Sequence, residues 1–360
     1  MTMRNLILPF ILLLTFVFSC RENDIDEGLE QKNASYDVYI AGRENNKACF
    51  WKNTIKTDLS NGDGIGTINI KVENNDVYVT GITLPNTANN GIEYFWKNNV
   101  RTTVKQYLNI PNNVQYYIKS FTVNNGDIYF AGYVENPTTT SAFDKFEMCF
   151  WKNGVKTILY KSQYYSSAES IMIDGSDVYI STAKVDNNQS LEYGYFKNTI
   201  FTSIPSTYVY NFAKNSNGIH LLFQNNFKYY SKNINTNTDA LIGDYNHPVH
   251  VLGKIISHNA NNDLYTIQSS SSGFYFKNNL QTIPTFSTLP YIQDMFVLDN
   301  NIYMIKYNNN LTPNPNNPNM TYNGKVFING VESQNITSVS NAGSGYYALG
   351  SFNSIFVVQN

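Results

Sequence analysis

The four histidines carry the chemistry that is simplest to recognise, and all of them lie between positions 220 and 258. His247 and His250 stand three residues apart, but a metal site would need a third close ligand and a fixed geometry. The sequence therefore predicts no metal site and no cofactor. His220 replaces the tyrosine of a repeat described below, which indicates a structural position. We keep His247 and His250 as candidates for a binding face.

Catalytic motifs are the next chemistry to look for. The acidic segment at residues 58–64 hints at a calcium loop, but its carboxylates miss the required register, which favours a plain turn. The sequence contains no Gly-x-Ser-x-Gly elbow, phosphate-binding loop, Cys-x-x-Cys pair or His-Glu-x-x-His helix. Carboxylate pairs for glycoside chemistry cannot be found by spacing when distant segments assemble them. Enzymatic activity stays open, and the sequence favours a protein that is not an enzyme.

The chain has three cysteines, Cys20, Cys49 and Cys149. Cys49 and Cys149 occupy matching places before Phe-Trp in two repeats that are not adjacent, where the short Cα separation of a disulfide is not expected. We predict two buried thiols that act as small hydrophobic side chains.

The amino terminus indicates an export signal. One positive charge, Arg4, precedes an apolar run over residues 6–18 that is too short to span a bilayer comfortably. The following Val17-Phe18-Ser19-Cys20 resembles the lipobox of bacterial lipoproteins. That resemblance implies cleavage before Cys20 and a diacylglyceryl group on its thiol, which would anchor the protein in a membrane. An ordinary cleaved signal with a chance cysteine is the alternative.

One phrase recurs along the body as a strand with a central tyrosine. Strong copies are Asp76-Val77-Tyr78-Val79 and Asp127-Ile128-Tyr129-Phe130. The central position recurs at residues 39, 78, 129, 179, 220, 265, 303 and 356. A period in the forties with strand-like composition is the spacing of propeller blades. The aspartates that open the phrase are expected to act as turn acceptors: Asp37, Asp76, Asp127, Asp177 and Asp263.

A second phrase follows the first in each repeat, as in Phe150-Trp151-Lys152-Asn153, and ends in a tight asparagine turn. Adding the strand before the tyrosine and the short return strand gives four strands per repeat, which we name A to D. The count predicts an all-β propeller with seven four-stranded blades, or eight as the alternative. We expect the last A strand, residues 346–350, to close the ring beside the first B, C and D strands. Residues 355–359 then form a surplus B strand.

The order of these phrases resembles that of kelch-type propellers, although the double glycine is missing. The Tyr-x-x-Gly and Trp-Lys-Asn-Gly repeats also resemble those of Bacteroidota lipoproteins over residues 36–360. This resemblance implies a lipid-anchored protein of the outer membrane, on either its periplasmic or its cell-surface side, and implies no particular activity. The predicted domains are a signal peptide at 1–19, an acidic tether at 20–35 and a propeller at 36–360.

Strand order decides which connections share a face. A–B and C–D turns are short and lie on one end of the blades, which we call the turn face. B–C and D–A connections lie on the other end, the loop face, and include the long segments 84–92, 135–145, 184–191, 307–323, 160–167 and 243–249. Tyr116, Tyr117, Tyr164 and Tyr165 come in pairs near D–A connections, where a ring could stack on a sugar or simply start the next strand.

The low content of charged residues limits the kinds of partner that the protein can bind. Only 14% of residues are charged and the formal net charge is -2, which excludes the basic surface of a nucleic-acid-binding protein. We predict a membrane-anchored binding or scaffold module for a protein or a glycan, acting through the loop face. A polysaccharide-active propeller enzyme is the alternative, and a structural partner of an envelope complex is a third. Charged residues at the channel mouth would favour the enzyme, whereas Asn, Ser and Tyr would favour binding.

Overall fold

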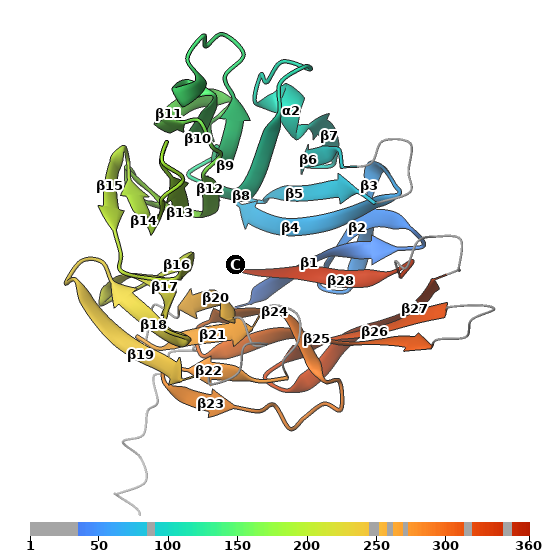
Figure 1. The fold of residues 1–360 in the computed structure, drawn as a ribbon. Coiled ribbons are helices and arrows are strands. Elements are labelled where there is room, and N and C mark those ends of the chain that lie inside the picture. The colour runs from blue at the N-terminus through green and yellow to red at the C-terminus, as the bar shows by residue number, and fades with distance from the viewer. Residues whose placement is uncertain are drawn as a thin grey trace, which may run out of the picture. The chain divides into compact units, whose positions relative to one another are not determined.

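The computed structural model describes residues 35–84, 91–244, 252–257, 262–268, 273–312, 319–340 and 348–360. Residues Val38–Val357 form one unit, and its strands make seven antiparallel sheets of four strands each. These sheets are the blades of a β-propeller (Figure 1), which confirms the all-β class and the seven-bladed ring. A second unit contains residues up to Asp37 and Val358–Asn360. Within it, the amide of Asn360 donates to the carbonyl of Ser35 at 2.8 Å.

Each blade starts from an inner strand and adds three strands outward. Blade 1 contains β28 (Ser351–Gln359), β1 (Tyr36–Glu44), β2 (Lys47–Lys52) and β3 (Ile55–Asp63). Blade 2 contains β4 (Ile65–Glu73), β5 (Asp76–Thr83), β6 (Glu93–Lys97) and β7 (Val100–Thr103). Blade 3 contains β8 (Tyr116–Asn124), β9 (Asp127–Glu135), β10 (Phe146–Lys152) and β11 (Val155–Ser162). Blade 4 contains β12 (Ser167–Asp174), β13 (Asp177–Val185), β14 (Leu191–Lys197) and β15 (Ile200–Ser203).

The remaining three blades repeat this order. Blade 5 contains β16 (Tyr208–Asn215), β17 (Gly218–Asn225), β18 (Lys228–Asn233) and β19 (Thr238–Asp244). Blade 6 contains β20 (Leu252–Ser257), β21 (Leu264–Gln268), β22 (Tyr275–Lys277) and β23 (Leu280–Thr282). Blade 7 contains β24 (Tyr291–Leu298), β25 (Asn301–Thr312), β26 (Asn319–Ile328) and β27 (Val331–Ser340).

The two repeated phrases meet at the end of each blade. In blade 3, Asp127 accepts from the Asn153 amide at 2.7 Å and pairs with Lys152 at 2.7 Å, while Lys152 lies 5.6 Å from the centre of the Tyr129 ring. Asn153 also accepts from the amide of Ile128 at 2.9 Å. Blades 2, 4 and 6 repeat the aspartate contacts. The repeat aspartates with described contacts are therefore acceptors, as predicted.

The core lies between neighbouring blades. Tyr78 and Phe95 of blade 2 pack with Phe121, Phe130 and Trp151 of blade 3, and the Phe95 and Phe130 rings meet edge to face at 5.6 Å. Burial of such large apolar side chains is the main stabilising contribution to each blade interface.

The two cysteines of the body also lie in the core. Cys49 and Cys149 are buried free thiols, as expected, and burial raises the pKa of each to about 12. Such thiols remain protonated and unreactive at neutral pH.

Ring closure differs from the prediction in its details. The inner strand beside β1–β3 is β28, Ser351–Gln359, so residues 355–359 belong to an A strand and not to a surplus B strand. Residues 348–350 are not in a strand, and the rest of 346–350 lies outside the described residues. The prediction was wrong because Phe356 imitates the aromatic position of the B phrase. Its true counterpart is Phe296 in β24, since Ile355-Phe356-Val357 repeats Met295-Phe296-Val297.

The two ends of the blades carry very different connections. Most A–B and C–D turns are two residues long, such as Asn98-Asn99, where both residues have positive φ, 49° and 67°. Connections on the loop face range from the single residue Gly64 to residues 104–115, which include the one-turn helix α2 (Val104–Tyr107). The 135–145 loop contains a 3-10 turn at Ala142–Asp144. The predicted 307–323 loop is shorter than expected, because β25 and β26 extend far into it.

Candidate binding surface at the channel mouth

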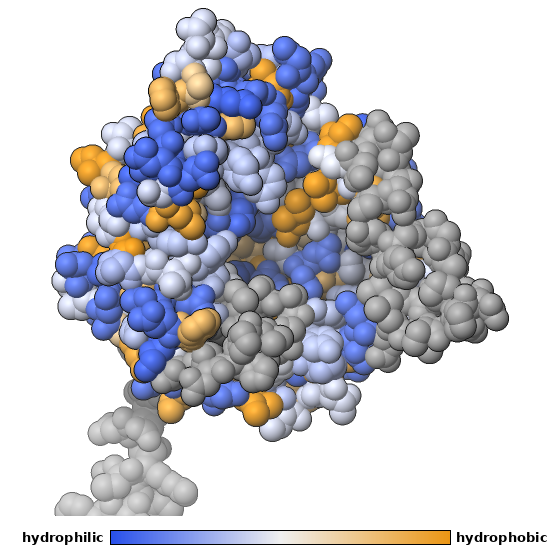
Figure 2. Space-filling view, viewed as in Figure 1, coloured by the Kyte–Doolittle hydropathy of each residue, from blue (hydrophilic) through white to orange (hydrophobic). Residues whose placement is uncertain are grey.

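The seven inner strands surround a central channel with a volume of about 490 Å³, lined by residues of β4, β8, β12, β16, β20, β24 and β28. Figure 2 shows the surface hollowed near the centre of the ring, with hydrophilic and hydrophobic residues both present around the hollow. The inner strands begin on the loop face. Their first residues therefore form the channel mouth on that face.

A β-bulge interrupts six of the inner strands at the same level. The register between A and B strands skips Ile68, Lys119, Glu169, Gly253 and Gln293, and in β16 it skips Tyr210 and its neighbour. A bulge adds an unpaired residue and re-aims its side chain, and bulges are common beside functional sites. Here the bulges place Lys119, Glu169 and Tyr210 in the lining of one pocket.

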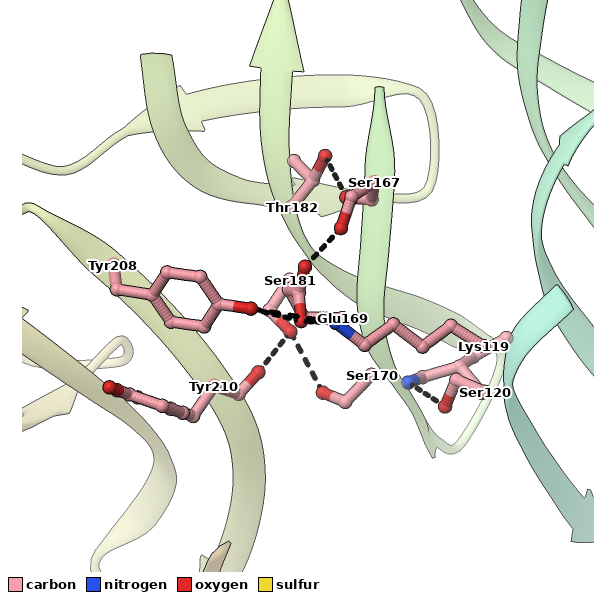
Figure 3. Close-up of polar contacts among 10 residues, drawn as sticks. Lys119, Ser120, Ser167, Glu169, Ser170, Ser181, Thr182, Tyr208 and Tyr210 are labelled. Carbon is pink, nitrogen blue, oxygen red and sulfur yellow. Dashed lines mark hydrogen bonds and ion pairs between the residues drawn. The ribbon is translucent and has the colours of Figure 1, made fainter. Parts of the chain in front are cut away.

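Lys119, Glu169 and Tyr208 form a polar network that joins three blades (Figure 3). The Tyr208 hydroxyl donates to Glu169 Oε2 at 2.8 Å, and the Lys119 ammonium donates to the same oxygen. Ser167 donates to the other carboxylate oxygen. Burial alone would lower the pKa of Lys119, but the hydrogen bond and charge of Glu169 outweigh burial and raise it. Burial, together with Glu169, also raises the pKa of Tyr208.

All three residues of this network line a pocket of about 650 Å³ on the loop face. Its aromatic wall consists of Tyr208 and Tyr210, whose rings lie 4.7 Å apart, together with Phe227. The remaining lining residues are mainly polar: Thr207, Asn211, Gln224, Asn226 and Gly253. Aromatic walls with a few positioned polar groups are the usual composition of small-molecule sites.

Phe227 is an unusual wall residue. It occupies the two-residue B–C turn of blade 5 with φ +64°, in a conformation that favours glycine or asparagine, and 66% of its surface is exposed. A bulky residue with positive φ is rare, and such strain concentrates at binding sites. The adjacent Asn226 also has positive φ. Its side-chain amide makes no hydrogen bond to any residue that the structure describes. The turn therefore presents a ring and a polar group together.

The four predicted tyrosines divide into two kinds. Tyr117 and Tyr165 are both exposed and both contact Tyr133, with ring centres 6.0 Å and 5.1 Å away. Tyr116 starts β8 and packs against the core, with Lys105 above its ring at 5.3 Å. The hydroxyl of Tyr164 accepts from the Gln189 amide at 2.6 Å. The structure therefore brings Tyr117 and Tyr165 into one aromatic surface around Tyr133.

Other predicted residues lie outside this surface. Cys20, His247 and His250 fall outside the described residues, as do residues 1–34 of the predicted signal and tether. His220 is buried in β17, where its ring nitrogens lie 3.0 Å from Ser231 Oγ and 3.2 Å from Asn215 Oδ1. Burial lowers its pKa. His220 is therefore a structural residue, as the sequence indicates.

The channel mouth contains both the charged side chains expected of an enzyme and the Asn, Ser and Tyr side chains expected of a binding protein. Charged residues are present, but they are paired: Glu169 with Lys119, and Asp294 with Lys254 at 2.5 Å. Asp294 also accepts from the backbone amides of Met295 at 2.9 Å and Ile355 at 3.0 Å. Serine, asparagine and tyrosine occupy much of the remaining lining. Both carboxylates are held by several donors, which suits positioning more than proton transfer.

The described residues were also compared with the requirements of a metal site and of a membrane-spanning helix. Among them, no group of three or more His, Cys, Asp or Glu side chains is arranged to hold a metal ion. No helix within these same ranges has the length and apolar character needed to cross a membrane.

Sequence reasoning did not identify Lys119, Glu169, Tyr208, Tyr210 or Phe227. A usable signal exists for Phe227, because it stands in a two-residue B–C turn whose counterpart in blade 1 is Asn45-Asn46, both with positive φ. The bulges leave no comparable signal, since an extra residue in one strand does not disturb the spacing of the repeats.

Known proteins resemble this chain in structure and not in sequence. No model of a known protein family matches the chain, and no curated protein matches it in sequence. An acylaminoacyl peptidase from Pyrococcus horikoshii is similar with a TM-score of 0.50 and 10% identity, over 83% of this chain and 50% of the peptidase. This chain thus spans half the length of that peptidase.

Two other solved structures match with lower scores. AztD from Citrobacter koseri has a TM-score of 0.43 and 9% identity, over 91% of this chain and 98% of that one. A PL25 ulvan lyase, a polysaccharide lyase, has a TM-score of 0.43 and 9% identity, over 89% and 96% of the two chains. At these identities the likeness concerns the fold alone, and the chain is similar to proteins that carry a β-propeller.

Proposed function

We propose that this protein is a lipid-anchored envelope propeller that binds a glycan through the loop-face pocket. The observation that carries the proposal is the pocket of about 650 Å³ in which Tyr208, Tyr210 and Phe227 stand beside amide and carboxylate side chains. The apolar face of a sugar ring packs on aromatic side chains, and its hydroxyls need donors and acceptors of this kind. A protein ligand would be expected to cover a larger and less concave surface.

The exposed rings of Tyr117 and Tyr165 support an extended ligand. Tyr117 lies in β8, the inner strand that contributes Lys119 to the pocket. Tyr165 lies in the connection just before β12, the inner strand that contributes Glu169. A chain of several sugar residues could contact both places, whereas a monosaccharide would occupy the pocket alone.

A glycan array probed with residues 30–360 tests the proposal. We expect a defined set of oligosaccharides to bind, and we expect Tyr208→Ala to weaken that binding. Val331→Ala, a change at an exposed apolar residue on the turn face, is the control and should bind as the parent does. Array-wide absence of binding, or equal binding by the Tyr208 variant, would contradict the proposal. Cleavage of a bound oligosaccharide would instead favour the polysaccharide-active enzyme.

The anchor is tested separately. Labelling cells with a radioactive or clickable fatty acid should mark the full-length protein and should fail to mark Cys20→Ala. The variant should also leave the membrane fraction, because a single cysteine would carry the acyl chains. A labelled or membrane-bound Cys20 variant would refute this part of the proposal.

A further inference from the structure

One level of the central channel contains a single charged residue. The level is defined by pairing with the central residue of each B phrase: Lys71 pairs with Tyr78, Thr122 with Tyr129, Met172 with Tyr179, Ala213 with His220, Ile256 with Tyr265 and Phe296 with Tyr303. Phe356 of β28 completes the level, since its ring lies 5.0 Å from that of Phe296. Lys71 is therefore a lone cation in a largely apolar ring.

Lys71 differs from the other lysines of the channel lining. Lys119, Lys214 and Lys254 each form an ion pair, with Glu169, Asp174 and Asp294 respectively. The Lys71 ammonium lies 5.2 Å from the centre of the Phe356 ring. Within the part of the chain that the structure describes, it makes no hydrogen bond and no ion pair.

The surroundings of Lys71 make its charge unfavourable. Burial and, to a smaller extent, the positive charge of Lys254 lower the pKa of Lys71 to about 8, although Asp294 opposes them in part. At neutral pH most Lys71 side chains still carry the proton, so the ring holds a cation without a counter-charge. An anion beside it would relieve this energy, because opposite charges attract more strongly inside a protein channel than in bulk water.

The channel has room for such an anion. Lys71 lines the cavity of about 490 Å³ together with the polar side chains of Asn69, Thr122 and Ser354. This cavity and the loop-face pocket share Lys119, Glu169, Asn211 and Gly253, so the two spaces adjoin. A small anion, or an acidic group on a larger ligand, could therefore reach Lys71 from the loop face.

We propose that the central channel binds one anionic oxygen group, a carboxylate or a sulfate, on the ammonium of Lys71. The hydroxyl of Thr122 and the amide nitrogen of Asn69 stand in the same cavity as further donors, and Ser354 holds Asn69 by donating to its Oδ1 at 3.4 Å. The anion can be free in solution or can belong to an acidic sugar. This site does not depend on the proposed glycan function, because inorganic sulfate tests it without any sugar.

The experiment follows the lysine side chains by NMR after reductive ¹³C-methylation, with the Lys71 signal identified by its absence in Lys71→Met. Sodium sulfate, sodium glucuronate and neutral glucose are titrated at constant ionic strength and pH 7. We expect the Lys71 signal to shift saturably with sulfate and glucuronate but not with glucose. Tighter binding of glucuronate than of sulfate would identify an acidic sugar as the source. Tighter binding of sulfate would identify a free anion.

The pH dependence is part of the same test. Bound anion should raise the pKa of Lys71 from about 8, and anion affinity should fall as the pH increases from 7 to 9. The charged groups around the channel are the three ion pairs named above, and of these only Lys254 and Asp294 act on Lys71. An affinity that does not change over this range would contradict the assignment.

Two variants separate the site from general effects of salt. Lys71→Met should lower the affinity for glucuronate, measured calorimetrically, by about tenfold or more, the usual effect of losing a charged hydrogen bond. Lys214→Met removes a lysine of the same channel that is already paired with Asp174, and should bind as the parent does. A Lys71 signal that shifts linearly like that of Lys214, or a Lys71 variant with parental affinity, would overturn the proposal.

Discussion

Phe227 illustrates how one residue can be poor for folding and useful for binding. Its φ of +64° is unfavourable for a bulky side chain, and its exposed ring contributes little burial. Asparagine occupies equivalent positive-φ positions in many turns of this chain, including the adjacent Asn226. A residue that opposes the local backbone preference, in the wall of a pocket, is best explained by contact with a ligand.

The variant Phe227→Asn should therefore separate stability from binding. We expect its free energy of unfolding to rise by about 1 kcal/mol, because the strained backbone becomes a favourable one. Glycan affinity should fall, because one aromatic wall is lost. Thermal unfolding and calorimetric titration measure the two effects. Phe143→Asn removes an exposed phenylalanine elsewhere on the loop face and should leave affinity unchanged. Reduced stability with unchanged affinity would contradict this interpretation.

At the scale of the strand, the repeated phrases are a hydrogen-bonding unit and not only a spacing signal. Asn153 at φ +49° closes the C–D turn, accepts from the Ile128 amide and donates to Asp127. The same asparagine therefore fixes the turn and ties strand C to strand B. This double role explains why asparagine recurs after Trp-Lys in blade after blade.

Asn153→Ala should consequently destabilise the propeller by about 1–3 kcal/mol, since it leaves a strand amide without its acceptor and places alanine at positive φ. Urea unfolding followed by tryptophan fluorescence measures the change. The control is Asn188→Ala, in the exposed loop between β13 and β14. Equal unfolding midpoints for the two variants would mean that the asparagine contacts are incidental.

The same unit predicts an acid sensitivity. Hydrogen bonds from Lys152 and Asn153 lower the pKa of Asp127, and corresponding contacts lower the pKa of Asp76 and of Asp177. A carboxyl whose pKa is lowered on folding contributes stability above its unfolded pKa of about 4 and loses it as the pH falls through the folded value. Stability should therefore decline below pH 4, and less steeply in Asp127→Asn. An unchanged slope in that variant would contradict the assignment.

The features of the fold that could be predicted from the sequence are those carried by the repeated phrases. The Tyr and Trp-Lys-Asn phrases recur in every strong copy, so strand order, blade number and the aspartate contacts could be predicted. Phe356 misled the strand assignment, because an aromatic residue in an apolar strand suits either an A or a B strand. The pocket could not be predicted, because Lys119, Glu169 and Tyr210 reach it through β-bulges, which recur in six blades without changing the spacing of the repeated phrases.

At the scale of the whole molecule, the ring depends on β28 being held from both sides. On the blade 7 side, Asp294 accepts from the Ile355 amide at 3.0 Å, and the Tyr322 hydroxyl donates to the Phe352 carbonyl at 3.1 Å. On the blade 2 side, the Asn353 amide donates to the Thr67 carbonyl at 2.7 Å. Closure therefore joins blades 7, 1 and 2 through side chains as well as through packing.

Asp294→Ala should weaken this closure. We expect a loss of about 3–5 kcal/mol, because the change leaves the Ile355 amide and the Lys254 ammonium without their buried acceptor. Asp174→Ala breaks the more exposed pair with Lys214 and should cost about 1 kcal/mol or less. Equilibrium urea unfolding of the two variants compares them directly. A similar loss of stability in both variants would contradict a special role of Asp294 in holding β28.

The central claim is that the loop-face pocket is a glycan site. It is tested most directly by a crystal structure of the propeller soaked with the oligosaccharide that binds best on the array. We predict sugar density between Tyr208, Tyr210 and Phe227, with a ring packed on at least one of these side chains. Sugar bound on the turn face, or an empty pocket in a crystal whose oligosaccharide lies elsewhere, would contradict the account.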